Sequence, residues 1–76
     1  MDYDHEKVDE VALALMYLTL HEDYGAERAW KSYDWEILNR LHAKGWVENP
    51  KSKAKSVVFT EEGLASAKEF FAKYFE

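Results

Sequence analysis

Residues 34–63 read DWEILNRLHAKGWVENPKSKAKSVVFTEEG, and they carry the clearest helix, turn and strand signals in the chain. Ile37, Leu38 and Leu41 recur at helical spacing after Asp34, a residue type that favours helix N-caps. Gly45 follows as the left-handed residue that commonly ends a helix. The stretch therefore predicts a helix that runs from residue 34 or 35 to residue 44.

A short β-ribbon is expected after this helix. Trp46-Val47 reads as one strand and residues 55–59 (KSVVF) read as its partner, because β-branched and aromatic residues favour strands. Asn49-Pro50 opens the turn between them, and a lysine-rich loop tip follows. The sequence therefore predicts a two-stranded β-hairpin with a solvated, basic tip.

Helices are expected on both sides of this centre. Asp4 and Thr60 are N-cap residue types, and they precede predicted helices over about residues 5–20 and 61–75. The first helix is apolar nearly all round between Val11 and Leu18, so either the fold wraps it closely or a second subunit covers part of it. Residues 21–32 are less regular: Gly25 breaks any long helix, and a short helix is expected over residues 26–30.

The pattern LHAKGWV…VVFTEEG, within roughly residues 34–75, combines a helix end, a short ribbon and the start of a second helix. This order of elements resembles that of the winged helix-turn-helix superfamily. This resemblance implies that the helix before the ribbon is a recognition helix and that the ribbon is the wing. We therefore expect residues 1–76 to form a single α+β, winged-helix-like domain with three main helices and a two-stranded hairpin. The short segment 21–32 departs from the superfamily, in which a full helix there contacts the phosphate backbone.

Taken whole, the chain resembles a family of short bacterial proteins known as a domain of unknown function. The resemblance is carried by KVDEVALALMYLTLH (residues 7–21), AWKSYDWEILNRLHAKGWV (residues 29–47) and KAKSVVFTEEGL (residues 53–64). It implies a free-standing cytoplasmic protein and assigns no activity or site residues.

Length and composition are consistent with that expectation. A chain of 76 residues makes one small domain, and the absence of cysteine excludes disulfides and suits a reducing cytoplasm. The chain shows no secretory signal pattern, and its longest apolar run, from Val11 to Leu18, is too short to span a bilayer. We expect a cytoplasmic protein.

Residue types that support catalysis or metal binding do not converge in the sequence. His5 with Asp9, or His21 with Asp23, could supply two ligands, whereas tight metal sites usually need three or four. The serines have no neighbouring base, and the three glycines stand alone rather than in a phosphate-binding loop. We therefore expect no catalytic residues, no cofactor and no metal, and the chain is not expected to be an enzyme.

The net charge of −5 is unevenly distributed. Residues 1–33 hold eight acids against three bases, whereas residues 34–60 hold five bases against three acids. A small DNA-binding regulator is the alternative function, and its expected contacts are Asn39, Arg40, Lys44, Lys51, Lys53 and Lys55. The net negative charge of the chain and the acidic residues at the start of the predicted recognition helix argue against DNA binding.

The leading hypothesis is a non-enzymatic protein-interaction module that forms a homodimer or binds another protein. Aromatic residues are enriched in interface cores, and four aromatics occupy the last seven residues. The expected interface residues are Leu13, Met16, Tyr17, Phe70, Tyr74 and Phe75. The expected core is Val11, Leu15, Leu18, Trp30, Trp35, Leu38, Leu41, Trp46, Val58, Phe59, Leu64 and Phe71.

Overall fold

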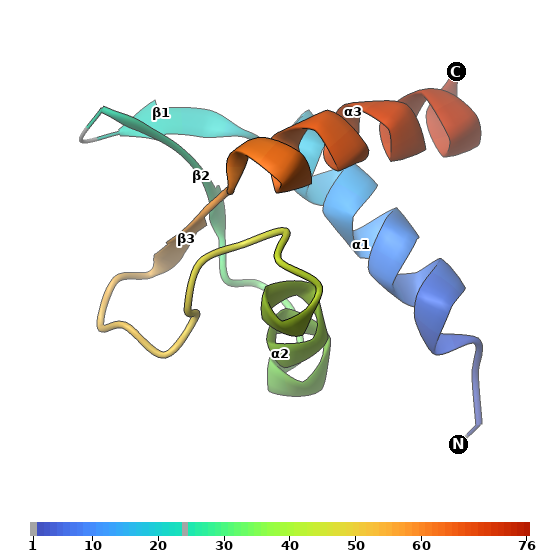
Figure 1. Cartoon of the computed structure of the whole chain (residues 1–76), viewed down its shortest axis with the longest axis horizontal. Helices are drawn as coiled ribbons and strands as arrows, with labels where there is room; N and C mark the ends of the chain where they lie inside the picture. Colours follow the sequence, from blue (N-terminus) through green and yellow to red (C-terminus); the bar gives the residue numbers. More distant parts are fainter. Residues whose placement is uncertain (1, 24) are drawn as a thin grey trace.

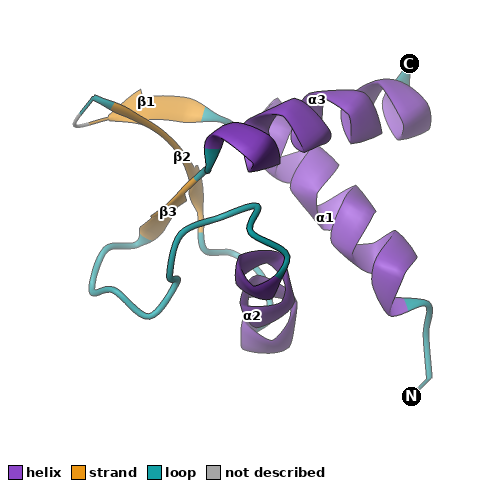
Figure 2. Ribbon diagram, viewed as in Figure 1, coloured by secondary structure: helices purple, strands orange, loops and turns teal. Residues whose placement is uncertain are grey.

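The computed structural model describes residues 2–23 and 25–76. Over these residues the chain forms, in order, α1 (His5–Leu18), β1 (His21–Asp23), β2 (Ala26–Trp30), α2 (Trp35–Ala43), β3 (Ser56–Val58) and α3 (Glu61–Phe75). α3 packs across α1, and the antiparallel sheet of order β1-β2-β3 lies to one side of this helix pair, with α2 below (Figure 1). The predicted α+β class is confirmed, and Figure 2 shows the helices in purple and the strands in orange in the same view.

The helix boundaries follow local signals. The Asp4 carboxylate accepts the backbone N–H of Lys7 at 3.1 Å, and the Thr60 hydroxyl accepts that of Gly63 at 2.9 Å, so both predicted N-caps are confirmed. Asp34 precedes α2, but its side chain makes no capping hydrogen bond there, which corrects the role expected for it. α1 ends at Leu18, two residues earlier than predicted.

The end of α2 is closed by Gly45. Its φ of 77° lies in the left-handed region, which lets its N–H reach the carbonyl of His42 at 2.9 Å. The N–H of Trp46 then reaches the carbonyl of Leu41 at 3.0 Å. These two bonds make a Schellman motif, so the predicted helix stop at Gly45 is confirmed.

Residues 21–30 form a β-hairpin, and the short helix expected over residues 26–30 is wrong. β1 and β2 pair in the register His21↔Arg28 and Asp23↔Ala26, with Gly25 at φ 72° in the turn between them. Ala29 on β2 is fully buried and belongs to the hydrophobic core. A left-handed turn residue between two pairing segments favours a hairpin over a helix.

The expected two-stranded wing is built differently. β3 takes β2 as its ladder partner, in the register Arg28↔Val58 and Trp30↔Ser56. The segment expected to pair with it is reduced to one bridge, Val47↔Phe59, and two flanking hydrogen bonds, one on each side of the bridge. The sheet therefore joins β3 to the hairpin of residues 21–30.

α1 carries two apolar stripes at helical spacing. The inner stripe, which is buried, consists of Asp9, Ala12, Leu13 and Met16. The outer stripe, which is less covered, consists of Val8, Val11, Leu15 and Leu18. The core then combines the inner stripe with side chains from the sheet, α2 and α3, notably Ala29, Leu38, Leu41, Val47, Val57, Phe59 and Ala67.

Four residues of the expected core are exposed instead. Leu15 is 37% exposed, Leu18 61%, Trp30 53% and Trp35 53%. The two leucines were assigned to the core because the outer stripe is wholly aliphatic, whereas the stripe that packs inward contains an aspartate. Among the other expected core members, Leu38, Leu41 and Phe59 are buried as predicted.

Candidate protein interface

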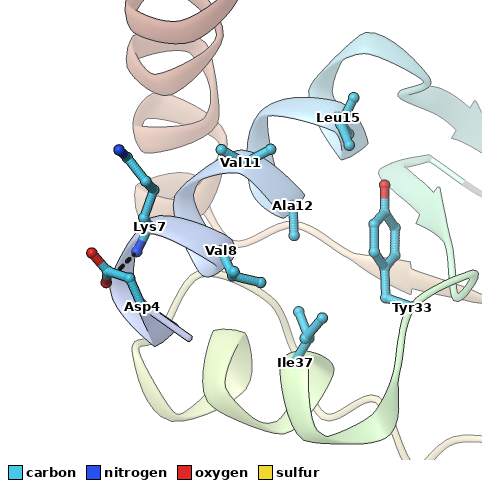
Figure 3. Close-up of a pocket in the computed structure, with 8 residues that line it drawn as sticks. All are labelled: Asp4, Lys7, Val8, Val11, Ala12, Leu15, Tyr33 and Ile37. Carbon is cyan, nitrogen blue, oxygen red and sulfur yellow. Dashed lines mark hydrogen bonds between the residues drawn. The ribbon is translucent and has the colours of Figure 1, made fainter. Parts of the chain in front are cut away.

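An apolar groove of about 470 Å³ lies between the outer stripe and the segment that leads into α2. Its walls are Val8, Val11, Ala12 and Leu15 from α1, with Tyr33 and Ile37 opposite them. Figure 3 shows Val8, Ala12 and Ile37 pointing into the space between the two helices, with Tyr33 at one end and Asp4 and Lys7 at the other. A hollow of this size, lined by apolar side chains, suits an apolar occupant.

The two polar residues at the groove end, Asp4 and Lys7, differ in whether their side chains already have a partner in the chain. The Asp4 carboxylate is engaged as the cap of α1. In the parts of the chain that the structure describes, the Lys7 ammonium makes no ion pair. Burial raises the pKa of Tyr33, so its hydroxyl stays neutral at ordinary pH. The groove end thus holds one acidic and one basic side chain, and the acidic one is engaged by a backbone N–H of its own helix.

A buried ion cluster holds α1 against α2. The fully buried Asp9 carboxylate accepts Nε of Arg40 at 2.9 Å and Nη2 of the same side chain at 2.8 Å. Lys44 Nζ lies 3.0 Å from the same carboxylate and 2.9 Å from that of Glu6. Because Arg40 and Lys44 project from α2 while Asp9 projects from α1, the cluster fixes the relative position of the two elements that form the groove.

The ion cluster also sets the acidity of Asp9. Burial alone would raise the pKa of Asp9, but the hydrogen bonds and charges of Arg40 and Lys44 outweigh it and hold that pKa below its ordinary value. A second cluster behaves similarly on the other side of α1. There the hydrogen bond from the Tyr74 hydroxyl, at 2.6 Å, and the Lys73 ammonium lower the pKa of Glu10 despite the opposing effect of burial.

The expected nucleic-acid contacts fall into two groups. Arg40 and Lys44 are held inside the chain by the ion cluster, so their charges are already neutralised. The remaining candidates are exposed: Asn39 on α2, and Lys51, Lys53 and Lys55 on the loop before β3. Lys31 ties this loop to the end of β2 by donating to the carbonyl of Ser52 at 2.9 Å. Of the expected basic contacts, the structure therefore leaves the three loop lysines exposed, whereas Arg40 and Lys44 are already paired within the chain.

The expected protein-interface residues are also divided. Leu13 and Met16 are fully buried in the core of their own chain, which corrects their expected place on an interface. Tyr17 and Phe70 are half-buried, and their rings contact Phe71 and Trp46 at centroid distances of 5.6 Å and 5.4 Å. Tyr74 is engaged with Glu10, whereas Phe75 remains 47% exposed.

Sequence reasoning missed the groove and the ion cluster. The signal for the buried face of α1 was present as residues 9, 12, 13 and 16, which follow the i, i+3, i+4, i+7 spacing of one helix face. The aspartate at position 9 obscured this spacing, because a carboxylate is rarely fully buried unless it is paired. Its partners come from more than 30 residues further along the chain, where no local pattern points back to Asp9.

No group of three or more histidine, cysteine or acidic side chains in residues 2–23 and 25–76 is placed to hold a metal ion. Over the same residues, no helix combines the length and apolar character needed to cross a membrane.

Comparisons with known proteins agree with the resemblance drawn from the sequence. The chain matches the domain of unknown function DUF6429 over residues 4–76. It is also 43% identical over 75 residues to the "Uncharacterized protein y4hR" of Sinorhizobium fredii, covering 99% of this chain and 97% of the relative. No solved structure matches the chain.

Proposed function

Since the chain belongs to the DUF6429 family, whose description names no activity, we propose a function from its own surface: a non-enzymatic protein-interaction module that self-associates through the outer stripe of α1. The observation that carries this proposal is the outer stripe, whose Leu15 and Leu18 remain exposed although α1 already has a packed face. Exposed apolar surface beside a hollow commonly marks a protein-binding site.

The energetics of the exposed leucines support the proposal. Fully burying a leucine side chain stabilises a complex by about 1.5–3 kcal/mol relative to leaving it in water. Leu18 is 61% exposed and Leu15 37%, so both have apolar area left to bury. Because the ion cluster holds α1 and α2 together, the groove walls need little reordering when a partner binds, which keeps the entropic cost low.

The arrangement of ionisable groups supports a non-enzymatic role. Asp9, Glu10, Arg40, Lys44 and Lys73 are all engaged in ion pairs that join secondary-structure elements. An active site usually directs such shifted groups into a hollow where a substrate can meet them. Here the groove is lined mainly by aliphatic side chains, with Tyr33 at one end and Asp4 and Lys7 at the other, and none of the five ion-paired groups lines it.

The proposal is tested by light scattering after size-exclusion chromatography over a range of protein concentrations. The unmodified chain should shift from monomer to dimer as its concentration rises, and Leu18→Ser should move that shift to about tenfold higher concentration or more. Phe75→Ser is the matched control, because Phe75 is similarly exposed but lies on α3. A chain that stays monomeric throughout, or one whose dimer is lost in Phe75→Ser and kept in Leu18→Ser, would contradict the proposal.

A further inference from the structure

The outer stripe holds both a hollow and a projecting side chain. The groove is built around Val8, Val11 and Leu15, while Leu18 lies beyond it on the same stripe. Leu18 is the most exposed of the large apolar side chains in the described residues, at 61%. Val11 and Leu18 are seven residues apart, which places them on the same helix face and about 10 Å apart along the axis.

We propose that the occupant of the groove is Leu18 of a second copy of this chain, delivered by an antiparallel pair of α1 helices. The inference rests on the proposed self-association and specifies its geometry. Leu18 of one copy lies opposite Val11 of the other, and the two-fold relation repeats the same contact in the opposite direction. The axis then passes close to Leu15, and each copy places its Leu18 in the other's groove.

The antiparallel direction follows from the shape of the stripe. A parallel two-fold pair would set Leu18 against Leu18 and groove against groove, which leaves both hollows unfilled. The antiparallel pair matches each projecting leucine to a hollow of about 470 Å³. A second copy is favoured over an unrelated partner because one chain supplies both halves of this contact.

Charge complementarity points to the same arrangement. Lys7, at the groove end, has no ion-pair partner within the described ranges 2–23 and 25–76. In the antiparallel register it faces the partner's chain beyond the end of α1, where Glu22 and Asp23 are exposed on β1. A basic residue at one end of the stripe therefore meets acidic residues from the other end.

The register is tested with engineered cysteines, which report cleanly because the chain has none of its own. Val11→Cys and Leu18→Cys chains, one of them carrying a size tag, are mixed and mildly oxidised, and the tagged heterodimer is measured on a non-reducing gel. We expect its yield to exceed that of a Val11→Cys and Phe75→Cys mixture by about tenfold, since a disulfide needs neighbouring Cβ atoms. Leu15→Cys should cross-link with itself, because it lies near the two-fold axis.

The outcomes separate this inference from the proposed function. Light scattering of the unmodified, cysteine-free chain tests self-association alone. If that chain dimerises but the Val11→Cys and Leu18→Cys mixture cross-links no better than the Phe75→Cys control, the register is wrong and self-association stands. If the unmodified chain does not dimerise, both statements fail. Circular dichroism of each variant confirms that a poor cross-linking yield does not come from unfolding.

Discussion

The carboxylate of Asp9 is fully buried between α1 and α2, where it receives the guanidinium of Arg40 and the ammonium of Lys44. A buried ion pair adds little over a well-packed apolar pair, but removing one partner leaves a charge that water can no longer solvate. The structural importance of this cluster should therefore show when a single partner is removed.

Arg40→Leu is expected to lower the free energy of unfolding by about 3 kcal/mol, near the lower end for a broken buried pair because Lys44 remains beside Asp9. Adding Asp9→Leu to that variant should recover much of the loss, since the uncompensated buried charge is then gone. Urea unfolding of both variants measures this, with the exposed Lys53→Gln as control. A double variant no more stable than Arg40→Leu would show that the cluster does not act in this way.

The lowered pKa of Asp9 makes stability depend on acidity. Because that pKa is lower in the folded chain than the value of about 3.9 in an unfolded one, Asp9 stabilises the fold above about pH 4. This contribution is lost as the pH falls through the folded-state pKa, and Glu10 acts in the same direction. The free energy of unfolding of the unmodified chain should therefore fall between about pH 5 and pH 2 more steeply than that of Asp9→Asn. Equal slopes in urea titrations at several pH values would contradict this expectation.

At the scale of single residues, the sequence predicts what depends on near neighbours. The caps at Asp4 and Thr60 and the helix stop at Gly45 involve bonds within a few positions, and all three were anticipated. The role of Asp9 was not anticipated, because it depends on where α2 lies after folding. Arg40 and Lys44 were interpreted as free cations for the same reason.

Among the secondary-structure elements, α3 is positioned by a close backbone contact. Gly63 lies in its first turn, and a Cβ atom added there would come within 1.7 Å of the carbonyl oxygen of Trp46. The hydroxyl of Thr60 also donates to the carbonyl of Gly45 at 2.5 Å, so the start of α3 is hydrogen-bonded to the Schellman motif that ends α2. The glycine is required here by space rather than by its backbone angles.

Gly63→Ala should therefore destabilise the fold by about 3 kcal/mol, because the added methyl group forces the start of α3 away from Trp46. In a free helix the same change would stabilise by about 1 kcal/mol, so the expected sign is reversed. Thermal unfolding measures the effect. Ala65→Gly, at an exposed position of α3, is the matched control and should cost only about 1 kcal/mol. An alanine variant as stable as the parent would show that the contact is not tight.

The type of each element was predictable wherever its pattern was long. The three predicted helices form close to their expected boundaries, because apolar periodicity and caps agree there. The hairpin of residues 21–30 was missed because a strand as short as HED carries little pattern. The partner of β3 was missed because SVV pairs with β2, which lies on the far side of α2 in the sequence. The buried face of α1 was missed because two apolar stripes compete and only tertiary packing chooses between them.

For the whole molecule, the distribution of apolar and charged surface bears on its partners. The chain carries a net charge of −5, and of the bases expected to meet DNA, Arg40 and Lys44 already pair with its own carboxylates. The outer stripe, in contrast, leaves apolar area uncovered beside a preformed groove. This distribution of charge and apolar surface supports a protein partner over a nucleic acid. The match between the groove and Leu18 supports a second copy of the chain as that partner.

The central claim is that this chain meets its partner through the outer stripe of α1, and dilution followed by amide N–H correlation spectra tests it most directly. As the chain is diluted, the signals that move should belong to residues 8, 11, 15 and 18 of the outer stripe, together with Tyr33 and Ile37 across the groove. Signals from residues 51–55 and 70–75 should stay in place. Spectra that do not change with concentration, or changes confined to residues 70–75, would contradict the account.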